Sequence, residues 1–204
     1  CPMKKHFALF LLLTLPLVSL SQSSENLLLM LQEEEKDSLP PLLPDRMIFS
    51  QSLLWGEKGL FRTTGISPLN AEQRMKEIKV RNSMLKAHQI VGYLTLGGML
   101  AQGIVGGKLY NGDNSLYQTH KNLGKAVTIS YFTGAGLSLF APPPLINLKQ
   151  RGLSSIKAHK ILATLHFSGM IATNLMATEN KELHKAAAYT TFTSYALAVL
   201  VFKF

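Results

Sequence analysis

The distribution of apolar and polar residues divides the second half of the chain into four long uncharged stretches joined by short polar ones. The stretches run from residue 88 to 108, from 120 to the proline triplet at 142–144, from 161 to 178 and from 186 to 202. A helix needs about 20 mostly apolar residues to cross a bilayer, and each stretch comes near that length. Short connections force neighbouring helices to run antiparallel. The pattern therefore predicts an all-α fold, a membrane four-helix bundle over residues 84–204.

A histidine stands at the start of each stretch. The four are His88, His120, His159 and His184. In an antiparallel bundle the first and third helices start on one side of the membrane, and the second and fourth on the other. The histidines therefore fall into two pairs, His88 with His159 and His120 with His184. Ionisable side chains within membrane helices usually mark a functional site, and imidazole is a common axial ligand of haem iron.

A small residue follows each histidine by four positions, which is one helical turn later on the same face. These residues are Gly92, Gly124, Ala163 and Ala188. A flat macrocycle bound through the histidine would lie against this face, where a large side chain would block it. Membrane helices are also generally rich in glycine and alanine, so the pattern supports the haem hypothesis without requiring it.

Four consecutive spans that each begin with a histidine, paired first with third and second with fourth, resemble the cytochrome b561 core. The resemblance covers roughly residues 84–204 and rests on the four histidines and the small residues. It implies two b-type haems, each held by one histidine pair, and an oxidoreductase-type electron carrier. The family's flanking outer helices have no obvious counterpart unless the N-terminal region supplies one.

Three lysines directly follow three of the histidines, namely Lys121, Lys160 and Lys185. Each could pair with a haem propionate or extend to lipid headgroups. His166 differs from the other histidines because it lies two turns deeper than His159 and no other span has a histidine at that depth. We interpret it as a structural histidine with a hydrogen-bond partner.

The composition narrows the classes of function. The net charge is +9, but the Lys and Arg residues stand mostly at the ends of apolar stretches, where anionic lipid would meet them. We therefore expect a lipid bilayer as partner and no nucleic acid. The single cysteine excludes an intrachain disulfide, a Cys-x-x-Cys-His attachment of c-type haem and a thiolate metal cluster.

The N-terminal part has two predicted regions. Residues 1–21 combine a basic start, a short apolar run and a small-residue cleavage site, as in a secretory signal peptide. Residues 22–83 read as an extracytoplasmic linker, followed by an interfacial segment around Trp55 and a basic amphipathic stretch. The latter should begin at an Asn70 cap and continue without a break into the first span. Further caps are expected at Asn114 or Ser115 and at Ser154 or Ser155.

The signal peptide and the positive-inside rule predict opposite orientations. The signal places residues 22–83 outside, yet that side then carries the greater number of Lys and Arg residues. We follow the signal and expect an integral protein, of a bacterial cytoplasmic membrane, with the N-terminal segment outside. Arg74, Lys79 and Arg81 would there attract an anionic reductant or an acidic partner protein.

The function expected from this pattern is transmembrane electron transfer through two haem b groups. The donor and acceptor could be a small reductant, a quinol or a redox protein, and homo-oligomerisation stays open. Two alternatives remain. One is a membrane-anchor subunit that binds one haem or none and recruits a redox partner. The other is a small transporter that handles metal ions directly with its histidines.

Overall fold

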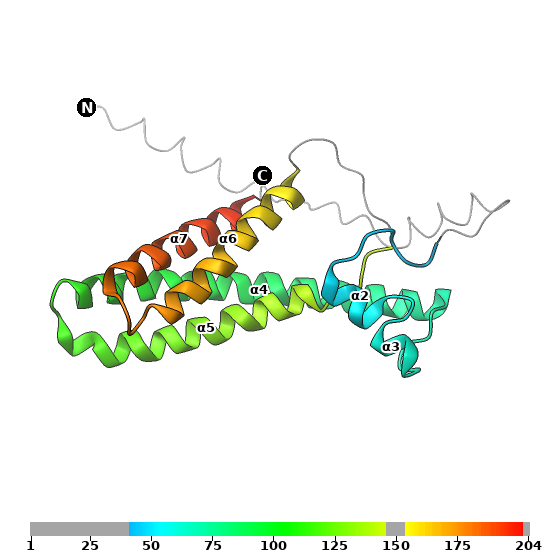
Figure 1. The fold of residues 1–204 in the computed structure, drawn as a ribbon, viewed down its shortest axis with the longest axis horizontal. Helices are drawn as coiled ribbons and strands as arrows, with labels where there is room; N and C mark the ends of the chain where they lie inside the picture. Colours follow the sequence, from blue (N-terminus) through cyan, green and yellow to red (C-terminus); the bar gives the residue numbers. More distant parts are fainter. Residues whose placement is uncertain (1–40, 146–153, 202–204) are drawn as a thin grey trace, which may run out of the picture. The chain divides into compact units, whose positions relative to one another are not determined.

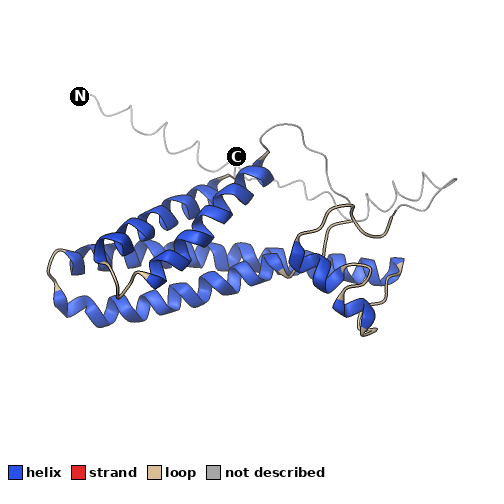
Figure 2. Ribbon diagram, viewed as in Figure 1, coloured by secondary structure: helices blue, strands red, loops and turns tan. Residues whose placement is uncertain are grey.

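The computed structural model describes residues 41–145 and 154–201, and all regular secondary structure within them is helical (Figures 1 and 2). The chain divides into two units, Cys1–Pro41 and Leu42–Phe204. The predicted signal peptide and most of the predicted linker lie outside the described residues. The helices are α2 (Phe49–Trp55), α3 (Leu60–Thr63), α4 (Ala71–Tyr110), the 3₁₀ helix η1 (Asn114–Leu116), α5 (Tyr117–Leu139), α6 (Ser155–Leu175) and α7 (Lys181–Leu200).

Helix α4 confirms that the basic stretch continues into the first apolar stretch, because it runs unbroken for 40 residues. The Asn70 side chain caps its start by accepting a hydrogen bond from the Gln73 backbone N–H at 2.8 Å. At 1.5 Å per residue the helix is about 60 Å long. It extends well beyond α5, α6 and α7, which have 20 to 23 residues each (Figure 1).

The long helices form two antiparallel hairpins. Helix α4 packs along α5, α6 packs along α7, and α7 also contacts α4. The turn after α4 contains Gly112, whose φ of +104° lies in the region that only glycine adopts without strain. The predicted cap at Ser154 is confirmed, since its side chain accepts from the Lys157 N–H. The cap predicted at Asn114 or Ser115 is wrong, because η1 starts there and α5 begins without a side-chain cap.

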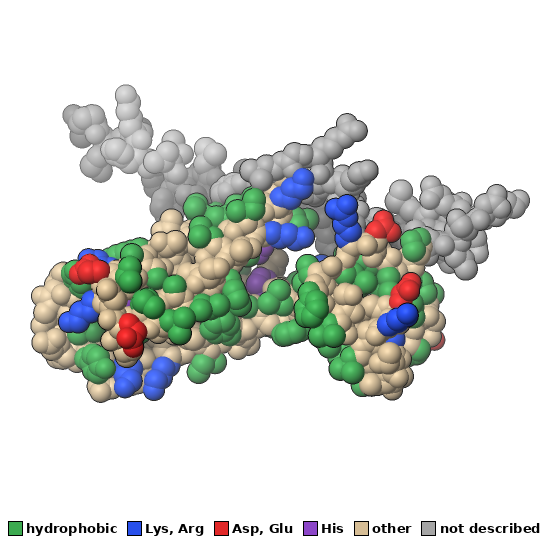
Figure 3. All heavy atoms as spheres, in the orientation of Figure 1, with side chains coloured by type: hydrophobic (Ala, Val, Ile, Leu, Met, Phe, Trp, Pro, Cys, Tyr) green, Lys and Arg blue, Asp and Glu red, His purple; other side chains and the backbone are tan. Residues whose placement is uncertain are grey.

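Polar side chains point into this bundle and apolar side chains cover its outside. Among the buried residues are Thr95, Thr191 and Ser194, which are 1 to 3% exposed. Large apolar side chains are exposed on all four helices, including Ile90, Leu94, Leu100, Ile104, Ile129, Phe132, Ile161, Leu165, Ile171, Leu197 and Leu200. Figure 3 shows apolar side chains spread over the visible face of the bundle. A helical bundle in water has the reverse arrangement, so this surface is suited to an apolar medium.

Among the described helices, α4 alone is long and apolar enough to cross a membrane by these two criteria. Only 11% of its most apolar 18-residue window is buried, so it is not the core helix of a soluble domain. The other three helices are less apolar because each includes a His-Lys pair near its start, and their inner faces carry Thr, Ser or Asn. The prediction of an all-α fold is confirmed. The structure identifies one candidate span where the sequence pattern predicted four.

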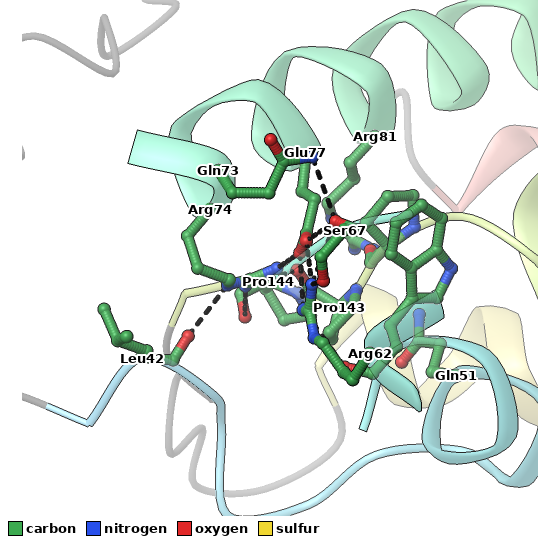
Figure 4. Close-up of polar contacts among 12 residues, drawn as sticks. Leu42, Gln51, Arg62, Ser67, Gln73, Arg74, Glu77, Arg81, Pro143 and Pro144 are labelled. Atoms are coloured by element: carbon green, nitrogen blue, oxygen red, sulfur yellow. Dashed lines mark hydrogen bonds and ion pairs between the residues drawn. The ribbon is translucent and has the colours of Figure 1, made fainter. Parts of the chain in front are cut away.

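A buried charge cluster holds the N-terminal end of α4, and Figure 4 shows it. The guanidinium groups of Arg62 and Arg74 both form ion pairs with the Glu77 carboxylate, and the Ser67 hydroxyl also donates to it. The side chains of the three charged residues are at most 5% exposed. Arg74 also donates to the carbonyl of Pro143 at 3.1 Å. The cluster therefore joins α3 and α4 to the proline triplet that follows α5.

This cluster corrects the role predicted for the basic residues. Arg74 is 1% exposed and ion-paired with Glu77, so it cannot attract a soluble anion. Arg81 donates to the Pro142 carbonyl at 2.7 Å, and Lys79 alone of the three is exposed.

The segment around Trp55 is also more ordered than predicted. The indole N–H of Trp55 donates to the Phe140 carbonyl at 3.0 Å, and the Gln51 amide donates to Ala141 at 3.2 Å. The segment therefore packs as α2 and α3 on the end of the α4–α5 hairpin.

Removing the shared carboxylate should destabilise the protein strongly. Burial raises the pKa of the Glu77 carboxyl, but hydrogen bonds from Arg62, Ser67 and Arg74 outweigh this and hold that pKa below its usual value of 4.5. Glu77→Gln leaves two buried guanidinium groups without a counter-charge, which costs about 3–5 kcal/mol. We expect this loss in thermal unfolding of the purified protein. As a control, Glu72→Gln breaks an exposed pair with Lys76 and should cost at most about 0.5 kcal/mol.

The same cluster predicts a pH dependence of stability. The folded pKa of Glu77 is depressed, so its stabilising contribution is present above pH 4.5 and is lost as the pH falls through the folded pKa. The difference in melting temperature between wild type and Glu77→Gln should therefore shrink on acidification below that value. A constant difference down to pH 2 would contradict this.

Candidate functional site

The four histidines lie in two facing pairs. His88 of α4 faces His159 of α6, with ring centroids 6.5 Å apart and ring planes at 89°. His120 of α5 faces His184 of α7, with centroids 6.1 Å apart and planes at 82°. The structure therefore brings together the same partners that the alternation of antiparallel helices predicts. Their role as ligands stays a prediction.

The spacing within each pair suits two ligands on opposite sides of one metal ion. A metal–imidazole nitrogen bond is about 2 Å long, which puts the centroids of two opposed imidazoles about 6 Å apart. The observed 6.5 and 6.1 Å agree with this value. Direct stacking would bring the rings closer and make them parallel.

Hydrogen bonds orient three of these rings for ligation through Nε2. The Nδ1 atoms of His88, His159 and His184 lie 2.8, 3.1 and 2.8 Å from backbone carbonyl oxygens of the neighbouring helix in each case. A carbonyl only accepts, so each Nδ1 carries the proton and the lone pair of the neutral ring is on Nε2. Metal-binding histidines typically have this arrangement, because the second hydrogen bond fixes the tautomer and the orientation of the ring.

The accepting carbonyls follow one rule. They belong to Gly134, Ala198 and Thr173, and each lies 14 residues after the histidine of its own helix. Fourteen residues span about 21 Å. Each of α5, α6 and α7 therefore supplies a histidine near its start and an acceptor carbonyl for a neighbour's histidine near its end. The two pairs accordingly lie at opposite ends of the bundle.

The small residues predicted to flank a macrocycle have mixed surroundings. Gly92 is buried and its carbonyl accepts from the Tyr195 hydroxyl at 3.3 Å. A Cβ on Gly124 would lie 2.9 Å from the Gln102 amide. Ala163 and Ala188 are half-buried. The sequence pattern missed Gly106 of α4, where a Cβ would lie 2.8 Å from the His120 ring.

The three lysines that follow the histidines also differ. The Lys185 amino group lies 3.7 Å from the Tyr110 ring centroid, in a cation–π contact, while the Tyr110 hydroxyl donates to Glu182 at 2.6 Å. Lys185 therefore has partners within the protein. Lys121 and Lys160 are exposed.

His166 lies in the middle of the bundle, between the two pairs. The Tyr131 hydroxyl lies 2.6 Å from its Nδ1, and the Tyr195 ring packs on it at 4.9 Å. Both tyrosines belong to the buried cluster formed with Met99, Val127 and Met170. These contacts agree with the interpretation of His166 as a structural histidine.

No family model, curated protein or solved structure matches this chain. Its function therefore has to be inferred from its own residues and their geometry. Within residues 41–145 and 154–201, no group of three or more His, Cys, Asp or Glu side chains could hold a metal ion. The two histidine pairs are thus the candidate site, with two protein ligands at each end.

The hydrogen bond at the centre of the bundle can be tested alone. Tyr131→Phe keeps the ring packing but leaves a buried His166 nitrogen unpaired, which should cost about 1–3 kcal/mol. At about 2–4 °C per kcal/mol for a chain of this size, the melting temperature should fall by several degrees. Tyr93→Phe is the control, because Tyr93 is 54% exposed on the outside of α4. Equal melting temperatures for the two variants would refute the structural role of His166.

Proposed function

We propose that this chain is a transmembrane electron carrier similar to cytochrome b561, with one haem b held by His88 and His159 and another by His120 and His184. The observation that carries the proposal is the pair of facing imidazoles at each end of the bundle, at the spacing of opposed ligands. Its second support is the set of carbonyl hydrogen bonds that leave Nε2 as the ligating atom in three of the four rings.

The number of protein ligands favours haem over a bare metal ion. Zinc in proteins takes four ligands, and three or more of them usually come from side chains. Each pair here offers two imidazoles, and no third His, Cys, Asp or Glu of the described residues joins them. A porphyrin supplies four nitrogen ligands of its own and needs only axial ligands from the protein. This argues against the metal-transporter alternative.

The apolar outer surface favours a bilayer as the surroundings of the bundle. Exposed Ile, Leu and Phe side chains cover all four helices, while Thr, Ser, Tyr and His point inward. Helix α4 satisfies the length and composition of a span. We propose that α5, α6 and α7 cross the membrane beside it, because their polar side chains have partners inside the bundle and need not face lipid.

Haem supplies a reversible one-electron iron centre, and the protein's contribution is position and insulation. Gly106, which touches His120, lies 18 residues after His88, so the two sites are about 27 Å apart along α4. The rings of Tyr131, His166 and Tyr195 fill the space between them. One site near each face would let electrons enter on one side and leave on the other.

One alternative retains a specific observation in its favour. Both histidines of the first pair are anchored by carbonyls, whereas His120 of the second pair is not. A membrane subunit with one haem would need the first pair only.

The purified protein should contain two non-covalent b-type haems per chain. His88→Ala or His159→Ala should remove one, His120→Ala or His184→Ala the other, and His166→Ala should keep both. Ring planes near 90° leave two iron d orbitals almost equal in energy, so the ferric form should give a highly anisotropic low-spin EPR signal. Haem content and EPR together check this. A colourless protein from haem-replete cells would refute the proposal.

Electron transfer can be measured across a sealed membrane. Proteoliposomes with a reductant outside should reduce an acceptor trapped inside, at a rate that drops to the protein-free level when either histidine pair is broken. The control is His166→Ala, which should retain most of the rate. If wild type binds both haems and the trapped acceptor stays oxidised, the chain is a one-sided subunit instead.

A further inference from the structure

His120 departs from the hydrogen-bonding rule that the other three site histidines follow. Its Nδ1 is buried and has no hydrogen-bond partner among the described residues. The carbonyl that the 14-residue rule assigns to it is that of Gln102, 14 residues after His88. The second site therefore lacks one of the contacts that fix a ligating imidazole.

The Gln102 side chain instead occupies the ligating atom of His120. Its amide nitrogen donates to the His120 carbonyl at 2.9 Å and lies 3.3 Å from His120 Nε2. An amide nitrogen only donates, so Nε2 is the acceptor and the proton is on Nδ1. The tautomer is thus the one needed for ligation, but the lone pair is already engaged. Gln102 Oε1 is itself buried without a partner, so this arrangement is not fully satisfied.

The backbone leaves space for a different arrangement. Gly106 is one turn after Gln102, and its missing Cβ lets the ring lie where a side chain would be 3.1 Å from Nδ1 and 2.8 Å from Cε1. His120 can therefore turn in place. Withdrawal of the Gln102 side chain would free Nε2 and allow Nδ1 to approach the carbonyl of the same residue.

We propose that Gln102 is a positioning residue that makes the two sites unequal, so that haem binds first and more tightly to His88 and His159. The second site, His120 with His184, accepts haem only after the Gln102 amide leaves His120 Nε2. This inference rests on the proposed function and adds an order of loading. It needs no charge change and no movement of the backbone.

Haemin titration into the full-length apoprotein in detergent tests it. His120→Ala leaves only the first site and His88→Ala only the second. Because contacts behind a metal ligand are worth about 10- to 100-fold in affinity, we expect haemin to bind that much more weakly to His88→Ala. Adding Gln102→Leu, which keeps the volume but removes the amide, should tighten the second site by up to about tenfold. It should leave the first site unchanged.

The matched control is Gln89→Leu, a change of the same type at an exposed position of α4. A purely structural Gln102 would give the opposite sign, because its loss would loosen the second site. Wild type and Gln102→Leu alone give a second measurement if a histidine variant does not fold: two binding phases in wild type should merge in the variant.

The outcomes separate the two proposals. Equal affinities of the two sites, or a second site that Gln102→Leu weakens, would overturn the inference while leaving the di-haem function intact. Failure of every variant and of wild type to bind haemin would refute the proposed function, and the order of loading with it.

Discussion

The arrangement of this protein depends on the hydrogen bonds between histidine Nδ1 atoms and carbonyls of neighbouring helices. A carbonyl inside a helix is already used by the helix, so it can hold a ring only at one place along the axis. Three such bonds at the same 14-residue offset set the sliding of α5, α6 and α7 against their neighbours. Once that sliding is set, the histidines face each other in pairs and polar groups meet in the interior.

The second constraint is the ion cluster at the start of α4. Arg62 and Arg74 share one carboxylate, that of Glu77, away from water, and Arg74 also reaches the Pro143 carbonyl. Buried charges of this kind are costly unless every donor has an acceptor, so the cluster defines a single docking position for α2 and α3. That position closes the end of the α4–α5 hairpin nearest His88, which is 11 residues after Glu77 on the same rigid helix.

The sequence was sufficient where the information is local or periodic. Uncharged stretches, the continuation of α4, the caps at Asn70 and Ser154, and the pairing of histidines all follow from spacing along one chain. The failures involve contacts between distant segments. Arg74 reads as an exposed basic residue until Glu77 and the prolines are placed around it, and Gln102 is one amide among several until the fold sets it against His120. The cap predicted at Asn114 or Ser115 failed because a 3₁₀ turn uses those residues first.

The constant offset between histidine and acceptor also limits how such a chain can change in length. One residue inserted between His120 and Gly134 would rotate the carbonyl by about 100° and move it about 1.5 Å, away from His88. The same holds for the interiors of α6 and α7. Insertions and deletions should therefore be tolerated only in the turns, such as residues 111–113 and 176–180, where no ligand and its acceptor are separated. Helix length in this bundle behaves as a fixed unit of inheritance, and loop length as a free one.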